Sequence, residues 1–297
     1  MSPRDFNTWL SDRRRRPLLM AVLNVTPDSF SDGGRFLDPV AAVTHALAMA
    51  AQGADLIDVG GESTRPGSQP VDATEQIRRV VPVIRAVRDR LTDVTLSIDT
   101  TRAEVAAAAL DAGADMVNDV SAGRDDPELL TLAARRTCPI VLMHMQGTPA
   151  TMQLNPTYLD VVREVGDFLG DRLAVAADAG VNPAKVLLDP GIGFGKTVEH
   201  NLELLRRLDQ LEATGRPLVV GTSRKGFIGR VLGEAGSPDP SARLFGTAAT
   251  VAWAVANGAA VVRVHDVGPM AQVVRMVRSI QGDGDKGFKA LRRRMGD

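Results

Sequence analysis

The sequence of 297 residues is poor in several features that mark particular protein classes. Its single cysteine, Cys138, excludes an internal disulfide, and because it begins an apolar run we interpret it as a core residue. No apolar run reaches the roughly 18 residues that a membrane-spanning helix needs. The N-terminus also lacks the apolar stretch of a secretory signal. We therefore expect a cytoplasmic protein without a membrane partner.

Charge of one sign is also lacking, because the formal net charge is only −1. Such a chain has no global field to attract nucleic acid. Two local basic clusters lie near the ends, at residues 13–16 and 289–294. Neither cluster is interleaved with the aromatic residues typical of single-strand-binding surfaces. We interpret both clusters as solvated ends and expect no nucleic-acid partner.

Short apolar runs alternate with amphipathic helical patterns along most of the chain. The run 18–24 has the length and composition of a buried strand, and the pattern 72–91 carries a helical apolar stripe. The expected strands are 18–24, 54–60, 94–99, 115–119, 139–145, 185–189, 217–221 and 260–265, and the expected helices are 39–52, 72–91, 102–112, 126–136, 157–180, 197–213, 224–233, 241–257 and 268–280.

Eight strand–helix units within about 260 residues predict a single-domain α/β fold, a (β/α)₈ TIM barrel. Near-continuous apolar strands fit a parallel sheet that is buried on both faces. We expect an N-terminal extension at 1–17, the barrel at 18–281 and a flexible basic tail at 282–297.

Polar residues end every expected strand. In barrels of this kind the active site lies at the carboxyl ends of the strands. A lone aspartate there often caps a turn, but polar tips on all eight strands indicate one mouth built for a nitrogen-rich ligand and an anion. The tips are Asn24, residues 58–62, Asp99, residues 118–119, Met143 with His144, Asp189, residues 221–225, and Arg263 with His265.

Four segments beyond these tips add binding groups. Residues 24–34 are expected to form a mobile lid, and Thr64 and Arg65 in 60–68 are expected to close over an anion. The glycines of 189–197 allow close backbone approach, and Phe194 can cover a flat ligand. The helix start at 221–226 is expected to offer unpaired N–H groups to an anion.

These segments resemble dihydropteroate synthases. MAVLNVTPDSFSDGG (20–34) and GADLIDVGGESTRP (53–66) are similar to the two long motifs of that family. The resemblance covers roughly residues 18–280. Five shorter matches follow in order, which are SIDT (97–100), NDVSAG (118–123), LLDPGIGFGKT (187–197), GTSRKGFIG (221–229) and RVHDV (263–267).

The resemblance implies a reaction in folate biosynthesis. A dihydropteroate synthase joins p-aminobenzoate to 6-hydroxymethyl-7,8-dihydropterin pyrophosphate, with Mg²⁺ and loss of pyrophosphate. Members are usually homodimers and are the target of sulfonamides, which mimic p-aminobenzoate.

The resemblance also implies residue roles. Asp189, Asn118 and Lys225 resemble the groups that read the pterin, and Asp99 resembles the carboxylate that stabilises developing positive charge. Asn24 is similar to the Mg²⁺ contact. The further substrate contacts are Arg65, Arg263 and His265 for pyrophosphate, Ser223, Thr64, Pro66 and Phe194 for p-aminobenzoate, and Met143 and Gly221; Asp99, Lys225 and Arg65 are the expected catalytic residues.

Three other interpretations remain at this point. A pterin-binding methyltransferase barrel would share the Asp and Asn contacts but would not need the two long loop motifs. A non-catalytic pterin-binding paralogue would have lost loop residues, whereas Asn24, Thr64, Arg65, Asp99 and Lys225 are all present. Nucleic-acid binding through the terminal arginines would give salt-dependent retention on DNA.

Overall fold

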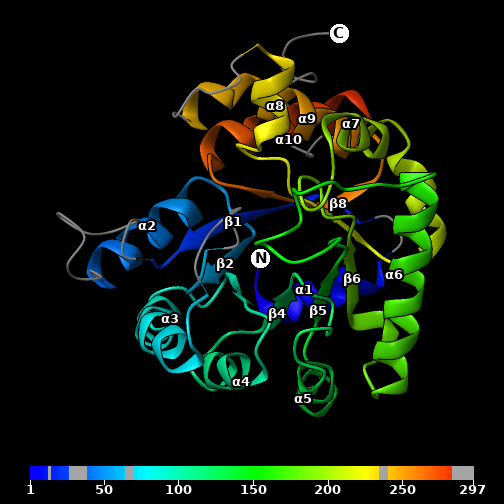
Figure 1. Cartoon of the computed structure of the whole chain (residues 1–297). Helices are drawn as coiled ribbons and strands as arrows, with labels where there is room; N and C mark the ends of the chain where they lie inside the picture. The colour runs from blue at the N-terminus through cyan, green and yellow to red at the C-terminus, as the bar shows by residue number, and fades with distance from the viewer. Residues whose placement is uncertain (13–14, 27–38, 64–69, 234–239, 283–297) are drawn as a thin grey trace, which may run out of the picture.

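A closed parallel barrel forms the centre of the molecule (Figure 1). The computed structural model describes residues 1–12, 15–26, 39–63, 70–233 and 240–282. Within these ranges eight strands pair in sequence order and β1 pairs with β8, which confirms the predicted (β/α)₈ fold. The strands are β1 (Leu18–Asn24), β2 (Leu56–Gly60), β3 (Thr95–Asp99), β4 (Met116–Asp119), β5 (Ile140–Met143), β6 (Val186–Asp189), β7 (Leu218–Val220) and β8 (Ala259–Val264).

Helices surround the strands as an outer ring (Figure 1). The helix after each strand returns the chain to the start of the next parallel strand. The ring consists of α2 (Pro39–Ala51), α3 (Ala73–Arg88), α4 (Ala103–Asp111), α5 (Glu128–Arg136), α6 (Val161–Asp178), α7 (Val198–Arg206), α8 (Gly226–Val231), α9 (Leu244–Ala256) and α10 (Val267–Ile280), with 3₁₀ turns at Pro183–Lys185, Leu208–Thr214 and Pro240–Arg243.

One predicted helix, 197–213, is divided in two. The α-helix ends at Arg206, and a 3₁₀ segment, Leu208–Thr214, follows it. The indole Nε1 of Trp253 on α9 donates to the carbonyl oxygen of Leu205 at 2.7 Å. That carbonyl is one of the helix-end acceptors that need an outside partner, so α9 satisfies the end of α7. Leu208 and Leu211 are buried beyond the break.

The apolar core has two main parts. The larger part lies between the strands and the outer helices and includes Cys138, as predicted. Burial raises the pKa of the Cys138 thiol to about 11. The smaller part fills the inside of the barrel near the strand starts and includes Leu18, Met20 and Leu56. In the described part of the chain, no helix is long and apolar enough to cross a membrane.

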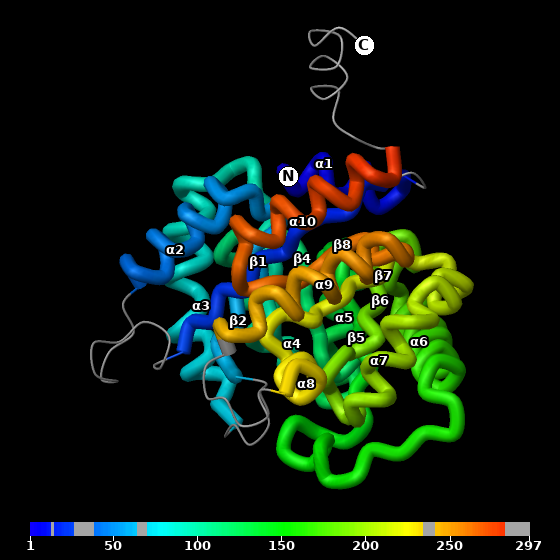
Figure 2. Tube along the Cα trace, turned by 90° about the horizontal axis from the view of Figure 1, so that it is seen from above, coloured from blue at the N-terminus to red at the C-terminus, as the bar shows by residue number. Residues whose placement is uncertain are grey.

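An extra helix, α1 (Pro3–Ser11), closes the amino-terminal end of the barrel. Phe6, Trp9 and Leu10 are buried and join the interior core at the strand starts. The Phe6 and Trp9 rings stack with centroids 5.4 Å apart. Figure 2 shows α1 at one end of the barrel and α8 at the opposite end. The segment expected only as an extension is thus a packed plug.

The residues after α1 are tied to the barrel as well. Arg16 forms an ion pair with Asp55, with Nη2 and Oδ1 2.5 Å apart. Asp55 Oδ2 also accepts from the Leu19 amide at 3.1 Å, so one carboxylate joins this segment to the start of β1. Arg15 lies over the Trp9 ring. Interpreting this cluster as a solvated end was therefore wrong for Arg15 and Arg16. The tail from residue 283 lies outside the described residues.

We expect Phe6→Ala to lower the free energy of unfolding by about 3–5 kcal/mol, because it removes a fully buried ring and leaves a cavity. Chemical denaturation measures this change. Thr8→Ala is the matched control, since Thr8 is exposed on the same helix and its loss should be nearly neutral. Equal stabilities of the two variants would contradict the packing of α1.

Candidate functional site

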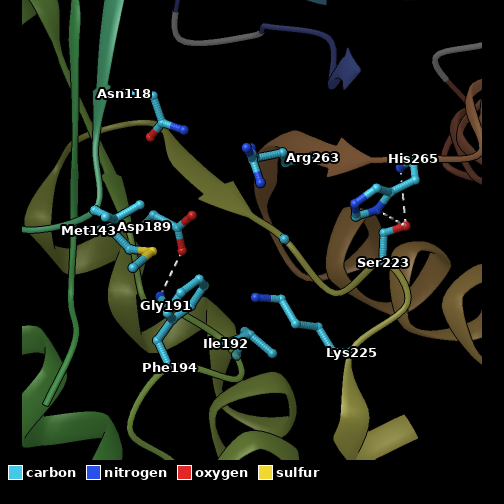
Figure 3. Close-up of a pocket in the computed structure, with 12 residues that line it drawn as sticks. Asn118, Met143, Asp189, Gly191, Ile192, Phe194, Ser223, Lys225, Arg263 and His265 are labelled. Carbon is cyan, nitrogen blue, oxygen red and sulfur yellow. Dashed lines mark hydrogen bonds between the residues drawn. The ribbon is translucent and has the colours of Figure 1, made fainter. Parts of the chain in front are cut away.

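The carboxyl ends of the strands surround a pocket. Figure 3 shows its polar side chains converging from several strands and loops. Nine of the predicted site residues line it: Asn118, Met143, Asp189, Phe194, Gly221, Ser223, Lys225, Arg263 and His265. Val120, Gly191 and Ile192 complete the lining.

Among the described residues, two of the predicted site residues, Asp99 and Asn24, do not line this pocket. Asp99 is ion-paired to Arg263, which does line it. Asn24 ends β1 opposite Gly60, and a Cβ atom built on Gly60 would lie 3.7 Å from Asn24 Oδ1 and 3.8 Å from Asp99 Oδ2. Asn24 and Asp99 therefore flank the same glycine. Thr64 and Arg65 lie outside the described residues, as do Pro66 and the predicted lid beyond residue 26.

Arg263 connects two buried carboxylates. Its Nε donates to Asp58 Oδ2 at 2.7 Å, and its Nη2 donates to Asp99 Oδ2 at 2.8 Å. Asn118 Nδ2 donates to the same Asp58 oxygen at 2.9 Å. Burial raises the pKa of Asp99 to about 7, although the Arg263 guanidinium opposes the rise. The pKa of Asp99 is thus close to neutral pH, and the ion pair with Arg263 stabilises its anionic form.

The sequence predicts Asp58 only as a polar strand tip, with no role of its own. In the structure its side chain is completely buried, and it accepts hydrogen bonds from both Arg263 and Asn118. Its Oδ1 has no hydrogen-bond partner in the described residues. A signal was present, because a carboxylate inside an apolar strand must find a partner.

Asp189 sits at the floor of the pocket. Its Oδ1 accepts from the Gly191 amide at 2.7 Å, as the dashed line in Figure 3 shows. Burial raises the pKa of Asp189 to about 6, against that hydrogen bond and the Lys225 charge. Gly191 has φ +65°, and a Cβ atom there would lie 1.8 Å from the His144 carbonyl oxygen. Only glycine fits this approach to Asp189.

Lys225 and Phe194 form the wall opposite Asn118 (Figure 3). The Lys225 Nζ lies 3.8 Å from the centroid of the Phe194 ring, a cation–π contact. Burial lowers the pKa of Lys225 to about 7, and Asp189 opposes this shift. A flat ligand between Asp189 and Phe194 would thus meet an acceptor, a donor and an aromatic face.

Ser223 and His265 form the pocket's third side. Ser223 Oγ accepts from the His265 amide at 3.1 Å and lies 3.1 Å from His265 Nδ1. Burial, followed by the charge of Arg263, lowers the pKa of His265 to about 3. His265 is therefore a neutral hydrogen-bonding group here.

Some of the backbone N–H groups that were expected to be unpaired before α8 donate hydrogen bonds within the protein. The Arg224 amide donates to Thr247 Oγ1 at 3.1 Å, and the Lys225 amide donates to the Thr222 carbonyl at 3.2 Å. Arg224 has a strained φ of 60° and is held by an ion pair with Asp266. The expectation of free N–H groups at these two positions was wrong.

Taken together, the barrel mouth offers a carboxylate floor, an amide, two cationic side chains and an aromatic wall. Residues 20–265 match the family described as pterin binding enzyme, which defines the class of this protein. A dihydropteroate synthase of Synechocystis sp. is 49% identical over 271 residues, covering 91% of this chain and 92% of that protein. The chain belongs to the dihydropteroate synthase family.

Solved structures agree in fold. Xanthomonas albilineans dihydropteroate synthase with 4-aminobenzoic acid superposes with a TM-score of 0.83 and 44% identity, covering 90% of this chain and 93% of that one. The same organism's enzyme in complex with 7,8-dihydropteroate gives a TM-score of 0.80 and 41% identity over 90% of this chain and 94% of that one. The methyltransferase interpretation has no support among these relatives.

Proposed function

We propose that this chain condenses 6-hydroxymethyl-7,8-dihydropterin pyrophosphate with p-aminobenzoate, giving 7,8-dihydropteroate and pyrophosphate. One carbon–oxygen bond breaks, one carbon–nitrogen bond forms, and the amine loses a proton. The observation that carries the proposal is the placement of Asp189, Asn118 and Lys225 around one pocket that Phe194 and Arg263 also line. We place the reaction in the cytoplasm, where a lone buried thiol such as Cys138 stays reduced.

The pterin would lie against Asp189. A carboxylate can accept two parallel hydrogen bonds from a guanidine-like ring edge, which fixes the plane of the ring. The Gly191 amide already holds one oxygen of Asp189 in place. Asn118, oriented by Asp58, and Lys225 would supply the remaining polar contacts. Met143 is buried at the same face and would pack against the ring.

The p-aminobenzoate would lie near Phe194 and Ser223. Phe194 offers an apolar ring, and the Lys225 ammonium lies 3.8 Å from the centroid of that ring. Ser223, linked to His265, offers a hydroxyl to a carboxylate. In this arrangement the aniline nitrogen would point toward the pterin side of the pocket and Gly221. Thr64 and Pro66 would complete this subsite, as the family resemblance implies.

The pyrophosphate would bind toward Arg263, His265 and Arg65. The Arg263 guanidinium already donates to Asp58 and Asp99. An incoming anion would therefore accept from the N–H groups of Arg263 that these carboxylates do not use. An anion beside His265 would also favour protonation of that ring.

Asn24 fits a magnesium contact. In the described residues no group of three or more His, Cys, Asp or Glu can hold a metal ion. Mg²⁺ takes oxygen ligands and commonly uses one or two protein side chains plus water and phosphate oxygens. The amide oxygen of Asn24, beside Gly60 and Asp99, suits that donor set. When bound, Mg²⁺ would neutralise charge on the leaving pyrophosphate.

Asp99 would act by electrostatics. As the carbon–oxygen bond breaks, the dihydropterin gains positive charge, and a fixed anion nearby lowers the energy of that state more than that of the bound substrate. Arg263 holds Asp99 in one place. Positioning and electrostatics then supply the rate without a general acid.

A turnover assay tests the proposal. Mixing the protein with both substrates and Mg²⁺ should give dihydropteroate, detected by mass, and chelation with EDTA should abolish it. Added Mg²⁺ should restore product. Binding of the pterin pyrophosphate without product would instead identify a non-catalytic paralogue, and product that survives chelation would contradict the metal requirement.

We expect Asp99→Asn to lower kcat by about 100-fold or more, while the affinity for pterin pyrophosphate changes little. In the wild type, kcat/KM should fall as the pH drops below about 7, because the raised pKa of Asp99 lets it protonate there. The variant should lack that acid limb. Asp115→Asn is the matched control, since Asp115 pairs with Arg88 at the far end of the barrel. Equal losses of affinity and turnover would refute the electrostatic role.

We propose a homodimer through the outer face of α9 and α10. Phe245 on α9 is 84% exposed, and Met276 and Ile280 on α10 are 63% and 74% exposed. The two helices pack side by side (Figure 1). We propose that these exposed apolar side chains belong to the surface that is covered in the dimer. A second copy is the occupant that the family resemblance implies.

Light scattering coupled to size exclusion should give a dimer mass for the wild type. Phe245→Glu combined with Met276→Glu should give a monomer, because two charges would be buried unpaired at the interface. Leu159→Glu is the control on a fully exposed leucine next to α6. A monomeric wild type, or a dimeric double variant, would rule out this interface.

A further inference from the structure

Two buried side chains, Lys196 and His144, lie next to the pocket without lining it. Lys196 is 3% exposed and ends the loop between Asp189 and α7. His144 is 5% exposed and follows β5. None of the roles described above uses either residue. A buried lysine is costly unless its ammonium group has partners, so its contacts indicate what keeps it there.

Lys196 connects the loop to the tip of β5. Its Nζ donates to the Phe194 carbonyl oxygen at 2.9 Å and lies 2.9 Å from His144 Nδ1. Burial, followed by the charge of Lys196, lowers the pKa of His144 to about 2, so the ring is neutral. His144 Nδ1 therefore accepts the second bond, with the ring proton on Nε2.

His144 is itself held firmly. Its amide donates to the Asp189 carbonyl at 2.9 Å, and its ring meets Phe168 edge-on with centroids 4.8 Å apart. Tyr158 lies beside the ring and donates from its hydroxyl to the Gly195 carbonyl at 2.8 Å. The Phe194 loop is thus fastened to the β5 side both by Lys196 and by Tyr158.

The partners of Lys196 indicate that its amine acts as a hydrogen-bond donor and that its charge is not what the site requires. In the described ranges it makes no ion pair within 4.0 Å of a carboxylate, and both of its bonded partners are neutral acceptors. Asp189 acts on it only at longer range. If the charge mattered most, the amine would be expected to contact Asp189 directly.

We propose that Lys196 is a positioning residue for the p-aminobenzoate half of the pocket, acting with His144 through the Phe194 carbonyl. The bond fixes the backbone of Phe194 and so holds its ring over Lys225. The role rests on the proposed function. Its consequence is selective, because the pterin contacts Asp189 and Asn118 are anchored by other groups.

Steady-state kinetics on Lys196→Met test this role. Methionine keeps the approximate length and the burial of the side chain, but it removes the amine and both of its hydrogen bonds. We expect KM for p-aminobenzoate to rise by about tenfold, the equivalent of about one good hydrogen bond. The dissociation constant of pterin pyrophosphate should stay within about twofold, and so should kcat at saturating p-aminobenzoate.

The partner residue gives a second, independent pair of variants. His144→Leu removes the acceptor and should raise the same KM. His144→Asn can place an amide oxygen near the position of Nδ1, so it should recover most of the wild-type KM. A role in packing alone would not distinguish leucine from asparagine in this way.

Arg88→Met is the matched control for general destabilisation. Arg88 also donates to backbone carbonyls, those of Gly113 and Leu91 at 3.0 Å, but it lies at the other end of the barrel. It should lower the unfolding temperature and leave both substrate constants unchanged.

Three results would overturn the role. The first is weaker pterin pyrophosphate binding by Lys196→Met with KM for p-aminobenzoate unchanged, which would mean that its charge acts on Asp189. The second is a Lys196→Met variant that behaves like Arg88→Met, with a lower unfolding temperature but unchanged KM for p-aminobenzoate and unchanged affinity for pterin pyrophosphate. The third is equal behaviour of the two His144 variants. A wild type that makes no product would instead refute the proposed function, on which this role rests.

Discussion

The bridge that Arg263 makes between Asp58 and Asp99 is the interaction on which the rest of the site depends. It joins β8 to β2 and β3 inside the closed barrel, and Asn118 on β4 adds to it through Asp58. A buried charge left without its partner costs several kcal/mol. The three charged groups must therefore stay together, and closing the barrel between β8 and β1 is what brings them within reach. The site's electrostatics are in this sense a result of the fold's topology.

Burial beside these charges shifts the pKa values of several ionisable groups toward neutral pH. It raises the pKa values of Asp99 and Asp189 to about 7 and 6, and it lowers that of Lys225 to about 7. Groups so poised take the charge that a bound ligand favours. A pyrophosphate near Arg263 would weaken its hold on Asp99, whereas a metal ion or a developing cation would strengthen the anionic form. Charge can thus be matched to the reacting ligand without large movement of the strands.

The barrel and most of the mouth are predictable from the sequence because both follow from local rules. Strands buried on both faces are apolar runs, and polar residues such as Asp189 mark the places where these runs end. Three features could not be read in this way. The packing of Phe6 depends on the open end of a barrel that only the closed sheet creates. The Leu205 carbonyl at the end of α7 is bonded by Trp253, 48 positions along the chain. The neutral state of His265 depends on burial.

The two ends of the barrel differ in what their sequences must satisfy. At the end covered by α1, the side chains only have to fill the space and bury apolar area. Rings of the right size are therefore enough to form the plug. At the mouth, a ring such as Phe194 stands on a loop, and loops hold side chains less precisely than strands do. The loop compensates with internal bonds: Gly191 packs against the His144 carbonyl, and Lys196 returns to the same histidine. Binding residues on this loop thereby gain the precision of the neighbouring strand β5, which explains why an otherwise costly buried lysine is placed there.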